Sequence, residues 1–189
     1  MPYVVAIAGP NGAGKTTIAT TVLSEMLGIT QYVNADTIAR GLSEFDPESV
    51  AIEAGRQNLR RLEELASAGE SFAFETTLSG KSYAARIKRW KAAGCKFLLF
   101  FYWLPDVEIA VERVAERVQS GGHNIPEAVI RQRYERGIAN FFEIYRPLAE
   151  AWIVFDNTGR TPHPIAFGST ADKILERASW ERLLNQAKK

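Results

Sequence analysis

Gly9-Pro10-Asn11-Gly12-Ala13-Gly14-Lys15-Thr16 matches the pattern G-x-x-x-x-G-K-[ST] at every constrained position. Glycines let a backbone curl so that successive N–H groups point at phosphate oxygens, and a helix that follows adds its positive end. In such loops the lysine reaches the β- and γ-phosphates, and the last hydroxyl holds magnesium. We therefore predict that Thr16 is a Mg²⁺ ligand and that ATP is bound by Gly9, Pro10, Asn11, Gly12, Ala13, Gly14, Lys15, Thr16 and Thr17.

Two other nucleotide-binding patterns are disfavoured. Asp36 lies 21 residues after Lys15 and could serve as the ribose-binding acid of a dinucleotide fold, but that fold needs G-x-G-x-x-G and not GKT. Leu78-Ser79-Gly80-Lys81 is similar to the signature of transporter-type ATPases. The chain has no room for the helical subdomain that carries that signature, so we interpret the tetrapeptide as a loop between a strand and a helix.

Short apolar segments alternate with longer segments of helical spacing around the glycine-rich loop. We expect strands at residues 3–8, 31–35, 71–76, 96–104 and 151–155, and helices at 15–27, 48–68, 83–93, 106–118, 126–145 and 171–187. Residues 165–167 are expected to add a short edge strand. The alternation predicts an α/β fold, a three-layer P-loop NTPase whose mostly parallel, five-stranded sheet has helices on both faces. No linker or repeat divides the chain, so residues 1–189 are expected to form one domain.

Composition excludes several functional classes. The chain of 189 residues has a net charge of +1 and one cysteine. The charge balance argues against nucleic acid or a membrane surface as a partner, and one cysteine excludes an internal disulfide framework and a Cys/His zinc cluster. The longest apolar stretch, Phe97–Leu104, is far shorter than the roughly 20 residues of a membrane span, and no signal-peptide pattern opens the chain. We expect a cytoplasmic protein.

Two acidic residues lie at or near the ends of predicted strands, at the sheet edge where α/β proteins bind ligands. Asp36 is expected to align and deprotonate an acceptor hydroxyl, and Glu75 to position the substrate or to act next to the metal. Asp36 could instead cap a helix that starts near Thr37, and Glu75 could pair with an arginine. Asp106 fits a helix cap, so a conventional second acidic motif is absent or replaced by Glu75.

A segment of roughly residues 113–136 is rich in arginine and is predicted to form a helical lid. Arg113 and Arg117 share a helix face and are expected to stabilise the charge that develops on the transferred phosphoryl group. Arg131 is expected at the substrate, and His123 could donate to phosphate or fix the Gly121-Gly122 hinge. The alternative is a solvated helix whose arginines pair with its glutamates, namely Glu112, Glu116 and Glu135.

The chain resembles the zeta toxin family of small P-loop kinases. The resemblance rests on GPNGAGKTT at 9–17, NAD at 34–36, FETTLSG at 74–80 and RVAERVQSGGHNIPEAVIRQRY at 113–134, and it covers most of residues 3–157. Family members transfer the γ-phosphate of ATP to the 3′-hydroxyl of the sugar in UDP-N-acetylglucosamine. The resemblance implies that Lys15 is the phosphate-loop lysine, Asp36 the catalytic base, and Glu75 and Thr77 substrate-side residues. It implies neither toxicity nor an antitoxin for this chain.

These observations predict an ATP- and Mg²⁺-dependent kinase that phosphorylates a small-molecule hydroxyl, with a nucleotide sugar such as UDP-N-acetylglucosamine as the first choice. A nucleoside or an antibiotic hydroxyl is an alternative acceptor. The second alternative is a nucleotide-dependent switch ATPase that acts through a protein partner, for which Trp152 and Trp180 would mark an exposed apolar surface. Residues 156–158 are expected near the nucleotide base. Sequence alone leaves open the acceptor, the oligomeric state, the base preference and which lid arginine acts.

Overall fold

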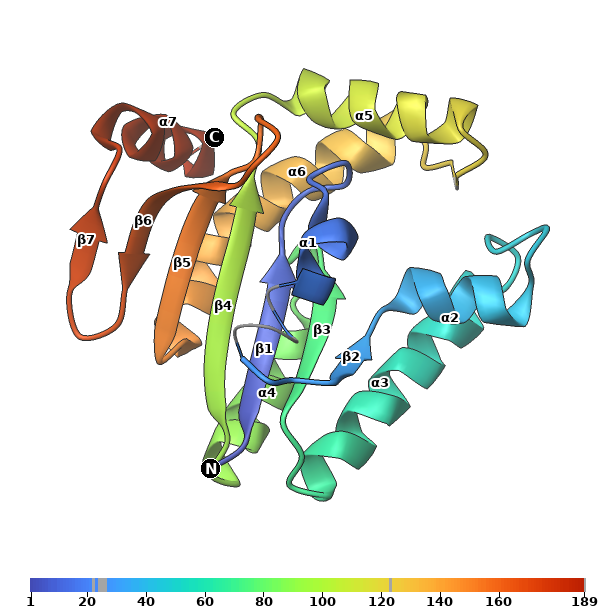
Figure 1. Ribbon diagram of the computed structural model, residues 1–189, viewed down its shortest axis with the longest axis horizontal. Coiled ribbons are helices and arrows are strands. Elements are labelled where there is room, and N and C mark those ends of the chain that lie inside the picture. The colour runs from blue at the N-terminus through green and yellow to red at the C-terminus, as the bar shows by residue number, and fades with distance from the viewer. Residues whose placement is uncertain (22, 24–26, 123, 189) are drawn as a thin grey trace.

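The computed structural model describes residues 1–21, 23, 27–122 and 124–188 and is built around one sheet (Figure 1). The sheet has seven strands in the order β2-β3-β1-β4-β5-β6-β7. Strands β1 to β5 are parallel, and β6 and β7 are antiparallel to their neighbours. Their bounds are β1 Tyr3–Ala8, β2 Gln31–Val33, β3 Phe72–Thr76, β4 Lys96–Trp103, β5 Ala151–Asp156, β6 His163–Gly168 and β7 Asp172–Ile174.

Helices cover both faces of the sheet, with α1 in front and α4 and α6 behind in the view of Figure 1. The α-helices are α1 Lys15–Thr21, α2 Ala35–Leu42, α3 Ala51–Ser67, α4 Ser82–Ala92, α5 Val107–Gln119, α6 Glu127–Asn140 and α7 Arg177–Ala187. A π-helix, Phe141–Tyr145, and a 3-10 turn, Arg146–Leu148, continue α6. Helix α5 crosses above the carboxyl ends of the central strands (Figure 1). The predicted P-loop α/β architecture is confirmed.

The edge strand predicted at residues 165–167 is present as β6, but β7 was not predicted, and the prediction of a helix from residue 171 was wrong. The chain turns back after β5 and adds two antiparallel strands, β6 and β7. Backbone N–H groups of Leu175 and Glu176 both donate to the Ile165 carbonyl, at 2.9 and 3.0 Å, which holds the preceding residues extended. Helix α7 therefore begins at Arg177. Local helical spacing is overridden here by hydrogen bonds to a strand, a tertiary effect that periodicity does not report.

Strand β1 lies in the centre of the sheet, between β3 and β4, and its residues after Tyr3 are fully buried. The glycine-rich loop leaves the carboxyl end of this strand. A Cβ atom on Gly9 would lie 2.2 Å from the Tyr102 carbonyl oxygen, and Gly9 has a φ of 144°, so only glycine fits at this exit. The central, buried strand of the sheet thus positions the loop.

Trp152 and Trp180 do not mark an exposed surface, and that prediction was wrong. Their exposed fractions are 6% and 8%, and the two rings stack with centroids 5.5 Å apart. The Arg146 guanidinium lies over both rings, 5.3 and 5.9 Å from the centroids. The pair belongs to the packing between β5 and α7. Separately, none of the helices in the described ranges is long and apolar enough to cross a membrane.

Candidate active site

The glycine-rich loop is packed beneath α5 and braced by side chains from far along the chain. Gly12 and Gly14 have φ values of 75° and 72°, and a Cβ on Gly12 would lie 2.9 Å from the Ala110 carbonyl oxygen of α5. The Asn157 carboxamide donates to the Ala13 carbonyl at 2.6 Å. Arg113 donates to the Gly12 carbonyl at 3.5 Å. These contacts hold the loop in the curled form that phosphate binding requires.

Lys15 is buried at the base of this loop, with an exposed fraction of 6%. Its Nζ donates to the Pro10 carbonyl at 2.9 Å and lies 3.5 Å from Oε1 of Glu75. Burial lowers the pKa of Lys15, and the carboxylates of Glu75 and Asp36 oppose that shift. A polyphosphate in the loop would therefore meet an ammonium group that has little water around it.

Glu75, near the end of β3, collects hydrogen bonds from three side chains. Its Oε2 accepts from the Thr16 hydroxyl at 2.8 Å, the Tyr32 hydroxyl at 2.6 Å and the Asn34 amide at 2.8 Å. Burial and the Glu75 carboxylate both raise the pKa of Tyr32, so that hydroxyl keeps its proton and remains a donor. The expected alternative, a pairing of Glu75 with an arginine, is replaced by contact with Lys15.

The Thr16 hydroxyl and the Glu75 carboxylate form an oxygen pair that fits Mg²⁺, which prefers oxygen ligands. Within the described ranges no group of three or more His, Cys, Asp or Glu side chains could hold a metal by itself. A magnesium ion here would need nucleotide phosphates as additional ligands, which is how Mg²⁺ is usually held in kinase sites.

Asp36 is not the cap of α2. Asn34 takes that position, and its side-chain oxygen accepts the Asp36 backbone N–H at 2.8 Å. The Asp36 carboxylate lies in the first turn of α2 and is exposed to solvent. Its side chain is therefore available to a ligand.

Two clefts meet at Thr16, Asp36 and Arg117. The phosphate cleft, of about 230 Å³, is lined by Asn11, Gly12, Gly14, Lys15, Thr16, Thr17, Asp36, Glu75, Arg113 and Arg117. The outer cleft, of about 650 Å³, is lined by Thr16, Ala35, Asp36, Ala39, Arg40, Glu44, Phe45, Asp46, Pro47, Glu48, Ala51, Ala54, Arg117, Gly121, Gly122 and Asn124. A molecule in one cleft would touch a molecule in the other.

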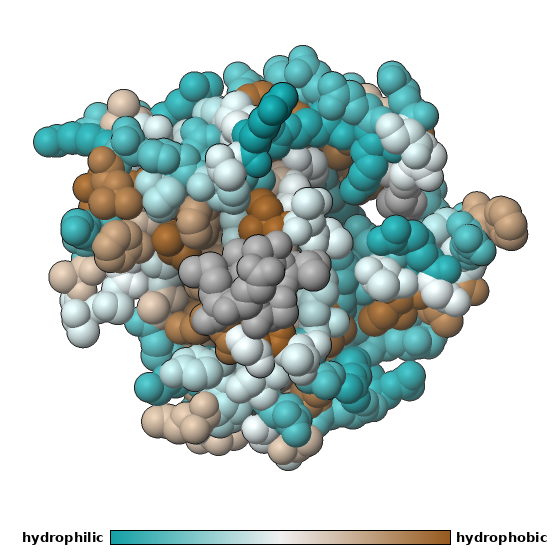
Figure 2. All heavy atoms as spheres, in the orientation of Figure 1, coloured by the Kyte–Doolittle hydropathy of each residue, from teal (hydrophilic) through white to brown (hydrophobic). Residues whose placement is uncertain are grey.

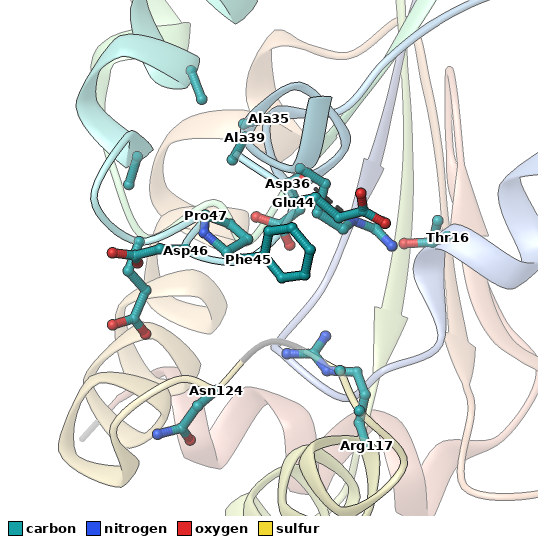
Figure 3. A pocket seen from close by; sticks show the side chains of 16 residues that line it. Thr16, Ala35, Asp36, Ala39, Glu44, Phe45, Asp46, Pro47, Arg117 and Asn124 are labelled. Atoms are coloured by element: carbon teal, nitrogen blue, oxygen red, sulfur yellow. Dashed lines mark hydrogen bonds between the residues drawn. The ribbon is translucent and has the colours of Figure 1, made fainter. Parts of the chain in front are cut away.

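The outer cleft lies between α5 and the segment that follows α2. In Figure 3 the Arg117 side chain rises from α5 into the opening, and Asp36 and Glu44 face it from the opposite wall. The ring of Phe45 lies at the same opening (Figure 3). The space-filling view shows a notch between the α5 side and the α2 side of the molecule, with mostly hydrophilic side chains around it (Figure 2).

The arginines of the predicted lid segment occupy three different environments. Arg113 donates to the backbone carbonyls of Asn157 at 2.9 Å and Thr158 at 2.7 Å, as well as to that of Gly12. Arg117 lines both clefts. Arg131 lies in neither lining, because it forms ion pairs with Glu108 and Glu127 and so ties α6 to α5. His123 lies outside the described residues.

The α6 half of the segment is anchored in the core and does not have the contacts of a free lid. The Tyr134 hydroxyl donates to the Leu104 carbonyl at 2.7 Å, and Asn140 donates to the Leu78 carbonyl at 2.7 Å. Gly137 packs so closely on the loop after β3 that a Cβ there would lie 2.4 Å from the Thr77 carbonyl oxygen.

Two further predicted positions are support elements in this structure. The Thr77 hydroxyl shares a hydrogen bond with Ser79 at 2.9 Å, and Thr77 lies in the lining of neither cleft. Asp156 accepts hydrogen bonds from Thr158, and Asn157 is buried against the phosphate loop. These contacts brace the site, and a role for residues 156–158 at the nucleotide base stays a prediction.

Sequence reasoning missed Tyr32, Asn34 and the segment 43–48. Tyr32 of β2 and Asn34, the extended residue that follows this strand, are two residues apart, so both side chains point to one side, toward Glu75. That alternation was a usable signal. Phe45, an isolated aromatic residue between acidic neighbours in Ser43-Glu44-Phe45-Asp46, was a second signal.

The sheet, the phosphate loop and the braced lysine define a P-loop kinase-like protein. Residues 4–141 match the family model AAA_33, described as an AAA domain, and the chain belongs to this family. A protein of Haemophilus influenzae, described as uncharacterized, is 32% identical over 126 residues, which are 67% of this chain and 88% of that protein.

Solved structures of similar fold include proteins bound to partners and a metabolic kinase. The AvrRxo1-ORF1:-ORF2 complex with ATP has a TM-score of 0.76 at 19% identity, and the match covers 97% of this chain and 63% of that one. The PezAT chromosomal toxin-antitoxin system of Streptococcus pneumoniae has a TM-score of 0.66 at 14% identity, covering 100% and 88%. Shikimate kinase from Acinetobacter baumannii in complex with shikimate has a TM-score of 0.51 at 17% identity, covering 100% and 96%. The resemblance to zeta toxins is confirmed in the fold.

Proposed function

We propose that this protein is an ATP-dependent phosphotransferase that moves the γ-phosphate of ATP to a hydroxyl group of a small molecule. The observation that carries the proposal is the junction of the two clefts at Thr16, Asp36 and Arg117. A hydroxyl compound in the outer cleft would lie beside the terminal phosphate of a nucleotide in the phosphate cleft. Such an arrangement turns a bimolecular reaction into one between neighbouring bound groups.

The residues at the junction supply the groups that phosphoryl transfer needs. The Asp36 carboxylate accepts the proton of the acceptor hydroxyl, while the oxygen of that hydroxyl forms a bond to the γ-phosphorus. The bond from that phosphorus to the β-phosphate oxygen breaks, and ADP leaves. Lys15 and the loop N–H groups hold the phosphates, and Arg117 stabilises the charge on the moving group. Thr16 with Glu75 would hold Mg²⁺, which neutralises phosphate charge when bound.

The similar structures support the kinase class, while the acceptor and any partner belong to the proposal. One neighbour was solved with ATP, another is a shikimate kinase, and two others are partner or antitoxin complexes. The resemblance to zeta toxins suggests a UDP-sugar, and UDP-N-acetylglucosamine is the first compound to assay. The acidic residues that line the outer cleft favour a different class of acceptor.

The test is the Asp36→Asn variant, assayed for transfer from γ-labelled ATP to compounds of a metabolite extract. Because Asn34 and not Asp36 caps α2, this change should leave the fold and ATP binding intact. Transfer should fall about 10²-fold or more, since the amide accepts no proton. Asp172→Asn, at the exposed edge strand β7, is the matched control and should transfer normally. Joint loss of ATP binding and transfer in Asp36→Asn would contradict the assignment. If the unmodified protein binds ATP tightly but gives no labelled product, a switch is favoured.

A further inference from the structure

The outer cleft has an excess of negative charge. Among the described residues, its lining contains two guanidinium groups, from Arg40 and Arg117, and four carboxylates, from Asp36, Glu44, Asp46 and Glu48. Asp36 and Arg117 stand at the junction with the phosphate cleft and are used in transfer. Glu48 already has an interaction of its own. The charged residues left to face the body of the acceptor are therefore Glu44, Asp46 and Arg40.

The remaining charged side chains of the outer cleft differ in the hydrogen bonds and ion pairs that they already form within the protein. Arg40 donates through Nε to the Asp36 main-chain oxygen at 3.4 Å, so it lies at the junction end of the cleft. Asp46 accepts the backbone N–H of Ser49 at 3.2 Å. Glu44 is exposed and has no ion pair within the described part of the chain. Glu44 is therefore available to pair with a cationic ligand in the opening.

Phe45 adds an aromatic surface between these acids. Its exposed fraction is 99%, yet its ring lies at the opening of the cleft (Figure 3). The face of an aromatic ring attracts ammonium groups, and neighbouring carboxylates add to this attraction. Small residues line the same cleft, namely Ala35, Ala39, Ala51 and Ala54. They leave room for a ring, and about 650 Å³ is in the range of cavities that hold drug-sized ligands.

We propose that the outer cleft selects an amine-bearing polyhydroxyl compound, of the amino sugar or aminocyclitol class, over a phosphate-bearing acceptor. The inference rests on the proposed function. In the reaction, ATP phosphorylates one hydroxyl of this compound, the proton passes to Asp36, and ADP leaves. The ammonium groups stay charged and are held by Glu44, Asp46 and the ring of Phe45. A UDP-sugar would instead bring two negative charges against the acidic wall.

The first experiment sorts acceptors by charge before any is identified. A metabolite extract is separated into cation-exchange, anion-exchange and unbound fractions, and each is incubated with the full chain and γ-labelled ATP. Label in a product of the cation-exchange fraction supports the proposal. Label only in products of the anion-exchange or unbound fraction overturns it, while the kinase assignment stands. Absence of any labelled product contradicts the proposed function, and the inference falls with it.

The second experiment compares glucosamine with glucose and 2-deoxystreptamine with its deaminated analogue, measuring ADP release and product mass. The amine-bearing member of a pair should have the higher kcat/KM, by about tenfold or more, which is the effect of one well-placed charge contact. The Glu44→Gln and Asp46→Asn double variant should reduce this ratio to within about threefold. Glu70→Gln, an exposed acid outside the cleft, is the control and should keep it.

Binding tests the inference without turnover. In the presence of ADP, 2-deoxystreptamine should raise the melting temperature of the native protein, and the double variant should lose this shift. A shift that is equal in both proteins, or one produced by UDP-N-acetylglucosamine alone, overturns the proposal. Because the double variant changes only exposed side chains, retained ATP binding by that variant shows that it is folded.

Discussion

Replacing Glu75 with glutamine removes a negative charge that accepts three hydrogen bonds and forms an ion pair with Lys15. Hydrogen bonds to a charged group contribute about 1.5–3 kcal/mol, and neutral ones about 0.5–1.5 kcal/mol. The three bonds to Oε2 should therefore lose about 1 kcal/mol each, so the protein without nucleotide should be destabilised by about 3 kcal/mol. In a chain of this size that lowers the melting temperature by about 6–12 °C. Urea unfolding and thermal unfolding of Glu75→Gln measure both values.

Glu63→Gln is the matched control for this prediction. Glu63 also faces three side chains, Arg86, Arg89 and Trp90, but its side chain is 36% exposed, against 14% for Glu75. Exposed pairs contribute about 0–1 kcal/mol, so the control should lose much less stability and should bind ATP normally. A loss below about 1 kcal/mol in Glu75→Gln, or equal losses in the two variants, would refute the role of burial in this network.

Three other variants test the phosphate cleft. Burial lowers the pKa of Lys15 in the folded protein below its usual 10.5. Between the folded and the unfolded pKa the unfolded chain binds more protons, so the free energy of unfolding of the wild-type protein rises with pH in that window. Urea unfolding of Lys15→Met across the same window should lack this rise. Arg113→Lys loses the fork that holds three carbonyls and should weaken ATP binding about tenfold by calorimetry, whereas Arg131→Lys should change it less than about twofold. Equal losses of ATP affinity in the two variants would contradict the role of Arg113 in holding the phosphate loop. Asn11 is buried, and its Oδ1 has no partner among the described residues; Asn11→Ala should leave the melting temperature without nucleotide unchanged or higher but reduce the shift caused by ATP.

The phosphate loop and the five parallel strands were predictable because their constraints are local. Gly12 and Gly14 occupy backbone conformations that other residues avoid, and buried strands leave continuous apolar runs in the sequence. Asp36 and Glu75 were placed correctly at one edge of the sheet, because parallel strands end on the same side.

The remaining features depend on which distant elements become neighbours. The bonds from Tyr32 and Thr16 to Glu75 require the order β2-β3-β1, which one sequence does not contain. Arg131 satisfies the same helical spacing whether it faces a ligand or Glu108, so spacing could not assign it. The outer cleft is formed by a segment near 35–54 and by residues 117–122 and 124, which meet only in the fold.

The brace on the phosphate loop has a consequence for the order in which the protein matures. The loop occupies residues 9–16 and leaves the ribosome early, but its supports at Arg113 and Asn157 are 101 and 144 residues further along. A nascent chain that ends before Asn157 contains the complete nucleotide-binding motif without the amide that holds its Ala13 carbonyl. Nucleotide binding is thus tied to the synthesis of the fifth strand, so that the first motif to be translated is among the last parts of the protein to acquire its working shape.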